Sequence, residues 1–179
     1  MELKYRNMLL VLAFSLFSTS TPAECQPIDA IKNIGNFPFV TAVYSSTATA
    51  GGDSLLCLSA VLTQYNPEAS NVTYVWLLRE DDGTERPVIH RIYEGDAPNQ
   101  VKDFSSDDPS SPATATITYT DTETCFVMKT DDLGGLCILW VNSEFKNNFP
   151  QECTLKYEES CGEGVLIYDQ DVCDKSTST

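Results

Sequence analysis

The stretch GGLCILWV, residues 134–141, decides how this chain folds. Two glycines end a turn, and a cysteine then opens an apolar run that is typical of a strand. Successive side chains of a strand point to opposite faces, so Ile138 and Trp140 share one face while Cys137 and Leu139 share the other. The pattern predicts a strand with an aromatic inner face and a cysteine on its outer face.

Similar segments recur through the middle of the chain. Short runs rich in Val, Ile, Thr and aromatic residues alternate with turn signals, among them DDGT at 81–84, which favours a hairpin. Seven or eight short antiparallel strands predict either a barrel or a sandwich. The runs lie at 37–45, 55–65, 72–79, 87–93, 114–120, 125–130 and 136–142.

Helical signals flank these strands. PIDAIKNIG, residues 27–35, predicts a short helix with Pro27 near its start and Gly35 past its end. QECTLKYEESCG, residues 151–162, predicts a helix of about three turns that stops at Gly162. Strands followed by one helix indicate a barrel with a helix packed on its outside.

The first 23 residues have the features of a signal peptide. A basic segment precedes the apolar run 8–17, and Thr21 and Ala23 supply the small residues of a cleavage site. This run is too short to cross a bilayer, which takes about 20 residues. We therefore predict a secreted protein without a membrane segment, in which residues 24–179 form one domain.

Composition argues against several functions. The net charge of −15 leaves no basic surface for a nucleic acid. A single histidine, His90, and the lack of any C-x-x-C pair argue against a zinc site. Without a G-x-S-x-G motif or a phosphate-binding loop, the chain is not expected to be an enzyme or to hold a cofactor.

The seven cysteines are predicted to form disulfides, as is usual in an oxidising compartment. Cys153, Tyr157 and Cys161 form one stripe of the predicted helix, and the two cysteines lie roughly 12 Å apart along it. A helix outside the barrel can therefore meet two cysteines on adjacent strands, and a further bridge can tie the C-terminal tail to an early strand. Cys25 is then the odd cysteine, and Asn71-Val72-Thr73 is a candidate glycosylation sequon. The predicted disulfides are Cys57–Cys173, Cys125–Cys153 and Cys137–Cys161.

Several of these motifs together resemble a known family. ITYTDTETC at 117–125, LCILWV at 136–141, Cys153 and Cys161 followed by glycine, and IYDQDVC at 167–173 are similar to the salivary lipocalins of ticks. This group is also called the tick histamine-binding family, and the resemblance covers residues 27–173. It implies an all-β fold: an eight-stranded antiparallel lipocalin barrel, with a short N-terminal helix and a C-terminal helix packed outside.

The resemblance also implies a function. Members are secreted and sequester host mediators such as histamine, serotonin, leukotrienes and thromboxane, and some bind host proteins. Amine-binding members carry Asp after a cysteine and Glu before Leu-Trp, where this chain has Phe126 and Ile138. We therefore expect a largely uncharged cavity. The residues expected to line it are Tyr44, Trp76, Tyr119, Phe126, Ile138 and Trp140.

Such a cavity favours a hydrophobic lipid mediator over an amine. Arg79, His90 or Arg91 near the barrel mouth would meet its carboxylate. An amine held by cation–π contacts is the first alternative, and a barrel packed solid with aromatic residues is the second. A third is an inhibitor of a host plasma protein that binds through mouth loops at 94–100 and 105–112. In each case we expect a monomer.

Overall fold

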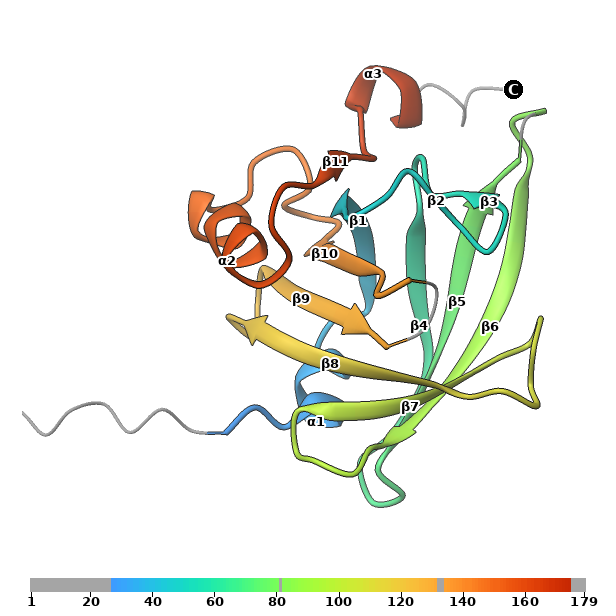
Figure 1. Cartoon of the computed structure of the whole chain (residues 1–179), viewed down its shortest axis with the longest axis vertical. Coiled ribbons are helices and arrows are strands. Elements are labelled where there is room, and N and C mark those ends of the chain that lie inside the picture. Colours follow the sequence, from blue (N-terminus) through green and yellow to red (C-terminus); the bar gives the residue numbers. More distant parts are fainter. Residues whose placement is uncertain (1–26, 81, 132–133, 175–179) are drawn as a thin grey trace, which may run out of the picture.

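The computed structural model describes residues 27–80, 82–131 and 134–174, and its main feature is a closed barrel of eight antiparallel strands (Figure 1). Strands that follow one another in the barrel are paired, and β10 also pairs with β1, so the sheet closes on itself. The prediction of a barrel is confirmed, and the sandwich is excluded. The barrel strands are β1 (Phe39–Ser45), β4 (Ser59–Asn66), β5 (Asn71–Arg79), β6 (Glu85–Glu94), β7 (Gln100–Ser105), β8 (Ala113–Thr120), β9 (Cys125–Thr130) and β10 (Cys137–Asn142).

Short elements surround the barrel. The expected N-terminal helix is α1, and the Asp29 carboxylate caps it by accepting a hydrogen bond from the Lys32 backbone N–H at 3.0 Å. The β2–β3 hairpin and α3 are additions that the sequence did not predict. These elements are α1 (Ala30–Ile34), β2 (Thr49–Ala50), β3 (Asp53–Ser54), α2 (Gln151–Cys161), β11 (Val165–Leu166) and α3 (Gln170–Cys173).

Three features of the sequence remain predictions. The signal peptide at 1–23 and Cys25 lie outside the described residues. Asn71 opens β5, where its side-chain amide donates to the Ala69 carbonyl at 3.2 Å, and its glycosylation is untested. In the described part of the chain, no helix has the length and apolar character needed to span a bilayer.

Helix α1 closes one end of the barrel, the lower end in Figure 1. Its Ala30, Ile31 and Ile34 side chains are buried in the barrel core. Tyr74 of β5 reaches this end, where its hydroxyl donates to the carbonyl oxygens of Ile34 and Phe37 at 2.7 and 2.6 Å. Burial raises the pKa of Tyr74, so the hydroxyl remains a donor.

Two tyrosines offer a matched test of these contacts. Tyr74→Phe is expected to lower the free energy of unfolding by about 1–3 kcal/mol, because it removes a buried donor from its acceptors. Tyr157 of α2 is equally buried, but its hydroxyl has no hydrogen-bond partner among the described residues. Tyr157→Phe is therefore expected to leave stability unchanged or to raise it. Urea unfolding measures both changes, and equal losses in the two variants would contradict this assignment.

Helix α2 packs against the outer face of β8, β9 and β10 (Figure 1). It buries only two side chains, Cys153 and Tyr157, so its apolar packing is slight. Disulfides at both ends of the helix fix it to the barrel, as the spacing of the cysteines predicted. All three expected disulfides are confirmed: Cys57–Cys173, Cys125–Cys153 and Cys137–Cys161.

Two β-bulges alter which side chains face inward. In β1 the register shifts between Ala42 and Tyr44, and in β8 it shifts between Ile117 and Tyr119. Each bulge adds one residue, which reverses the alternation beyond it. Tyr44 consequently stacks on Tyr157 of α2 at 5.9 Å, and Tyr119 packs in the same cluster outside the barrel. The prediction that Tyr44 and Tyr119 line the cavity is wrong.

Candidate ligand-binding site

An open pocket of about 440 Å³ occupies the end of the barrel opposite α1. Its walls come from β5 to β9, and its rim comes from the β2–β3 hairpin and the β7–β8 loop. This volume lies within the range of sites for small organic molecules. The larger apolar side chains that line it are Leu55, Trp76, Leu78, Val88 and Leu136.

A largely buried carboxylate lies in this wall. Asp103 of β7 accepts a hydrogen bond from His90 Nδ1 through its Oδ2 atom at 2.7 Å, and both side chains are nearly buried. The other oxygen, Asp103 Oδ1, is buried and has no hydrogen-bond partner among the described residues. The His90 ring stacks on Trp76 with 4.1 Å between ring centroids. Aspartate, histidine and tryptophan thus form one polar and aromatic cluster in the pocket.

Further carboxylates lie at the rim. Asp53, Asp107 and Asp108 line the pocket, and Arg86 is paired with the first two of these. None of the described residues that line the pocket is a lysine or an arginine. The prediction of a largely uncharged cavity is therefore wrong, because the pocket carries acidic groups at its wall and rim.

The opposite half of the barrel is filled by side chains. The void there measures about 20 Å³, which is close to the space for one water molecule. Phe126 and Trp140 line it, and Trp76 borders both this void and the mouth pocket. Ile138 is fully buried in the same core. The barrel thus combines a packed lower half with an open mouth.

The six residues expected to bind a ligand therefore separate into three groups. Trp76 lines the mouth pocket, whereas Phe126, Ile138 and Trp140 face inward as predicted but belong to the packed half. The two tyrosines lie outside. Sequence reasoning placed no acid in the cavity because it assigned no strand to residues 100–105, which carry Asp103.

The side chains expected to meet a lipid carboxylate are placed differently. His90 faces inward but is occupied by Asp103. Arg79 donates to the Val172 carbonyl at 3.0 Å on the outside of the barrel, and Arg91 is exposed on β6. Of the loops expected at the mouth, 105–112 lies there, whereas 94–100 lies at the closed end, where the Pro98 carbonyl accepts from Ala30 N–H.

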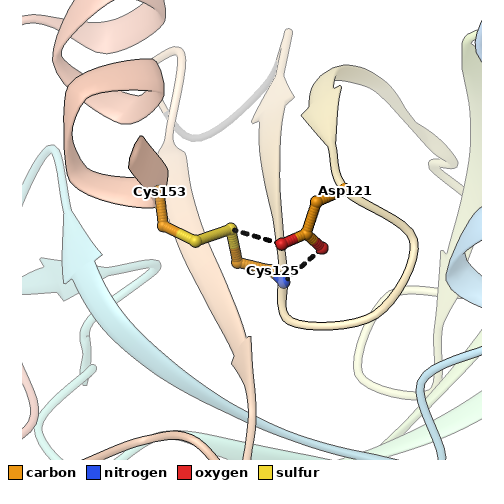
Figure 2. A group of neighbouring side chains, drawn as sticks. All are labelled: Asp121, Cys125 and Cys153. Atoms are coloured by element: carbon orange, nitrogen blue, oxygen red, sulfur yellow. Dashed lines mark hydrogen bonds between the residues drawn. A yellow bond between two sulfur atoms is a disulfide. The ribbon is translucent and has the colours of Figure 1, made fainter. Parts of the chain in front are cut away.

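A group of Asp121, Cys125 and Cys153 has the residue types of a metal site (Figure 2). The two sulfurs are joined to each other in a disulfide and are not thiolates. Asp121 Oδ1 accepts the backbone N–H groups of residues 123, 124 and 125 at 2.7–3.0 Å, which shapes the turn before β9. This group is a structural feature of the β8–β9 connection.

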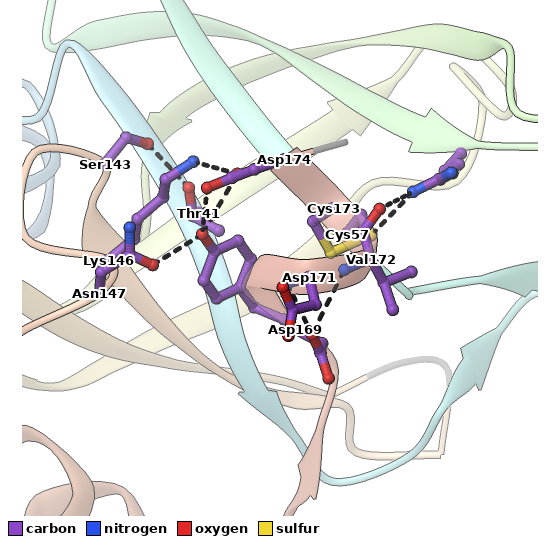
Figure 3. A network of polar contacts seen from close by, with 12 residues as sticks. Thr41, Cys57, Ser143, Lys146, Asn147, Asp169, Asp171, Val172, Cys173 and Asp174 are labelled. Carbon is purple, nitrogen blue, oxygen red and sulfur yellow. Dashed lines mark hydrogen bonds and ion pairs between the residues drawn. A yellow bond between two sulfur atoms is a disulfide. The ribbon is translucent and has the colours of Figure 1, made fainter. Parts of the chain in front are cut away.

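A polar network lies outside the barrel beside the Cys57–Cys173 disulfide (Figure 3). Lys146 pairs with Asp174 at 2.7 Å, and the Tyr168 hydroxyl donates to Asn147 at 2.9 Å. Thr41 and Ser143 share a hydrogen bond of 2.8 Å next to them. The contacts of Tyr168 and Asp174 fix the segment after β11 to the connection between β10 and α2.

Comparisons with known proteins agree with this architecture. A family model described as tick histamine binding protein matches residues 28–175. No curated protein sequence matches the chain significantly. A solved structure of AM182 in complex with serotonin has a TM-score of 0.63 and 17% identity, and the match covers 82% of this chain and 95% of that chain.

Two further solved structures share the fold. Japanin from Rhipicephalus appendiculatus, bound to cholesterol, has a TM-score of 0.58 and 13% identity, over 81% of this chain and 99% of that chain. The amine-binding protein of Rhodnius prolixus, in complex with tryptamine, has a TM-score of 0.50 and 15% identity, over 87% of this chain and 96% of that chain. At these identities the likeness extends to the fold alone.

Proposed function

Because this chain belongs to the tick histamine-binding protein family, we propose that it binds a small aromatic amine in the pocket at its barrel mouth. The family and the matched structures are binding proteins and not enzymes. The chain is a small-ligand-binding protein of the lipocalin type. We further propose that it sequesters a host mediator outside the cell.

One observation carries the proposal: Asp103 lines the pocket, and its buried Oδ1 atom has no hydrogen-bond partner among the described residues. A buried carboxylate oxygen is costly to leave without a partner, and an ammonium group supplies both a hydrogen bond and a compensating charge. His90 already occupies the other oxygen, so the carboxylate is oriented before a ligand arrives. An amine that enters the mouth therefore meets a preorganised acceptor.

The aromatic part of the ligand has a place beside this carboxylate. Trp76 and the apolar side chains Leu78 and Val88 line the same pocket. An aromatic ring buries apolar area against them and gains further energy from contact with the indole. Negative charge at the rim also raises the local concentration of cations. A ligand with an aromatic ring and an ammonium group therefore matches both the apolar side chains around Trp76 and the Asp103 carboxylate.

The same charges oppose an acidic lipid. Its carboxylate would be desolvated next to Asp103, and no described residue lining the pocket offers a lysine or arginine to pair with it. A lipid mediator would be favoured in a cavity without acids. The presence of Asp103 in the pocket reverses that preference.

Ligands that share one ring and differ in charge test the proposal. Tryptamine, tryptophan and indole-3-acetate all carry indole, with a net charge of about +1, 0 and −1 near neutral pH. We expect isothermal titration calorimetry to detect one tryptamine per chain and no binding of the other two. Arachidonate, as a probe of the lipid class, is expected not to bind.

Each other outcome contradicts the proposal. Equal binding of tryptamine and indole-3-acetate would mean that the ring alone is recognised. Binding of arachidonate without tryptamine would restore the lipid class, and binding of none of the probes would remove the pocket as an amine site. A host plasma protein as a further partner stays a prediction, which capture from plasma tests separately.

A further inference from the structure

Arg86, near the start of β6, is bound to three separate segments at the barrel mouth. Its Nη2 atom lies 2.7 Å from an oxygen of Asp53 in β3, and its Nη1 atom lies 2.8 Å from an oxygen of Asp107 in the β7–β8 loop. Its Nε atom lies 2.8 Å from an oxygen of Glu80 in the β5–β6 turn. One guanidinium therefore links three segments that are distant from one another in the sequence.

Two of these segments form the rim of the mouth pocket. Asp53 lies in the β2–β3 hairpin together with Ala50 and Gly51, which also line the pocket. Asp107 lies in the β7–β8 loop beside Asp108, another lining residue. Arg86 does not line the pocket itself, so it holds both sides of the rim from behind. Any widening of the mouth that separates these two segments must break at least one of its ion pairs.

The chemistry of the cluster suits a reversible closure. A guanidinium carries five donors in a fixed fork, so it engages several carboxylates at once, whereas a lysine ammonium has no such geometry. The Arg86 side chain is 34% exposed, and its partners are 38–54% exposed. Ion pairs with this exposure are individually weak and are screened by salt. Without Arg86, its three carboxylate partners would repel one another.

We propose that Arg86 is a positioning residue that latches the rim of the barrel and thereby sets the rate at which ligand leaves. This inference rests on the proposed amine site, because the rim it closes is the rim of that pocket. Arg86 acts through Asp53 and Asp107 and makes no contact with the ligand.

Three variants separate the latch from a general effect of charge. Arg86→Gln removes the charge, Arg86→Lys keeps the charge without the fork, and Arg91→Gln removes one charge from an exposed position on the same strand. We expect stopped-flow measurements to show tryptamine dissociation roughly tenfold faster in Arg86→Gln, less accelerated in Arg86→Lys and unchanged in Arg91→Gln. Added salt should reduce the difference in dissociation rate between the wild-type protein and Arg86→Gln, because it screens the ion pairs that Arg86 makes.

Hydrogen–deuterium exchange gives a readout that needs no ligand. We expect the backbone amides of residues 49–54 and 105–113 to exchange faster in Arg86→Gln than in the wild-type protein or in Arg91→Gln, with the remaining barrel unchanged. Exchange that is unchanged at the rim, or faster throughout the barrel, would overturn the latch. If wild-type protein binds no tryptamine, the amine proposal fails, and the exchange data still decide whether Arg86 closes the rim.

Discussion

Replacing Asp103 with asparagine is expected to weaken tryptamine binding by roughly 100-fold, because loss of one member of a buried charge pair typically costs 2–5 kcal/mol. The substitution keeps the shape of the side chain and leaves a carbonyl oxygen to accept the hydrogen bond from His90 Nδ1. With that carbonyl oxygen directed at His90, an amide NH2 group takes the place of Oδ1, so the variant loses both the negative charge and the acceptor proposed for the ammonium group. Isothermal titration calorimetry on the two proteins measures the difference.

Asp108→Asn is the matched control for this substitution. Asp108 also lines the pocket, but it lies in the exposed β7–β8 loop, where its carboxylate accepts from the Ser110 hydroxyl at 2.9 Å. Loss of a solvated rim charge is expected to change affinity by no more than about threefold. If both variants lose the same affinity, the net charge of the mouth attracts the ligand and Asp103 does not bind it directly. If Asp103→Asn binds as tightly as the wild-type protein, the assigned acceptor is wrong.

The sequence predicted the barrel and its covalent links because both depend on simple periodicities. Alternation in CFVMKT and LCILWV put Cys125 and Cys137 on one face of adjacent strands, and helical spacing put Cys153 and Cys161 on one stripe. The structure joins these residues as the two patterns require. Where a strand or helix is regular, side-chain direction follows from position in the chain alone.

The residues of the candidate site are harder to predict from sequence periodicity. The inward side chains of β7 are Val101, Asp103 and Ser105, which become polar toward the mouth, so QVKDFS lacks the apolar alternation that marks a strand. A strand that contributes polar groups to a binding site necessarily weakens its own sequence signal. The bulges in β1 and β8 pose a separate problem. A single extra residue there reversed the expected direction of Tyr44 and Tyr119 without any glycine or proline to indicate it.

The second large effect is expected for the disulfide that closes the longest loop. Cys57 and Cys173 are 116 residues apart, whereas the other two pairs are 28 and 24 residues apart. In the chain-entropy description, a crosslink restricts the unfolded chain more as its loop grows, by about 5 kcal/mol for the longest loop and about 3.5 kcal/mol for the others. The double variant Cys57→Ala/Cys173→Ala is therefore expected to lose about 4–5 kcal/mol of unfolding free energy.

Other native contacts of the C-terminal segment explain why we expect nearly the full loss of unfolding free energy in this variant. The C-terminal segment is also held by the Lys146–Asp174 ion pair and by the hydrogen bond from Arg79 to the Val172 carbonyl (Figure 3). We expect these contacts to keep the segment docked without the disulfide. The folded state then gains little conformational entropy, whereas the unfolded chain gains the full amount. For a domain of this size, Tm should fall by about 10–20 °C in differential scanning calorimetry. Cys125→Ala/Cys153→Ala is the comparison, and a larger loss in that variant would mean that docking of α2, and not loop length, dominates the stability of the barrel.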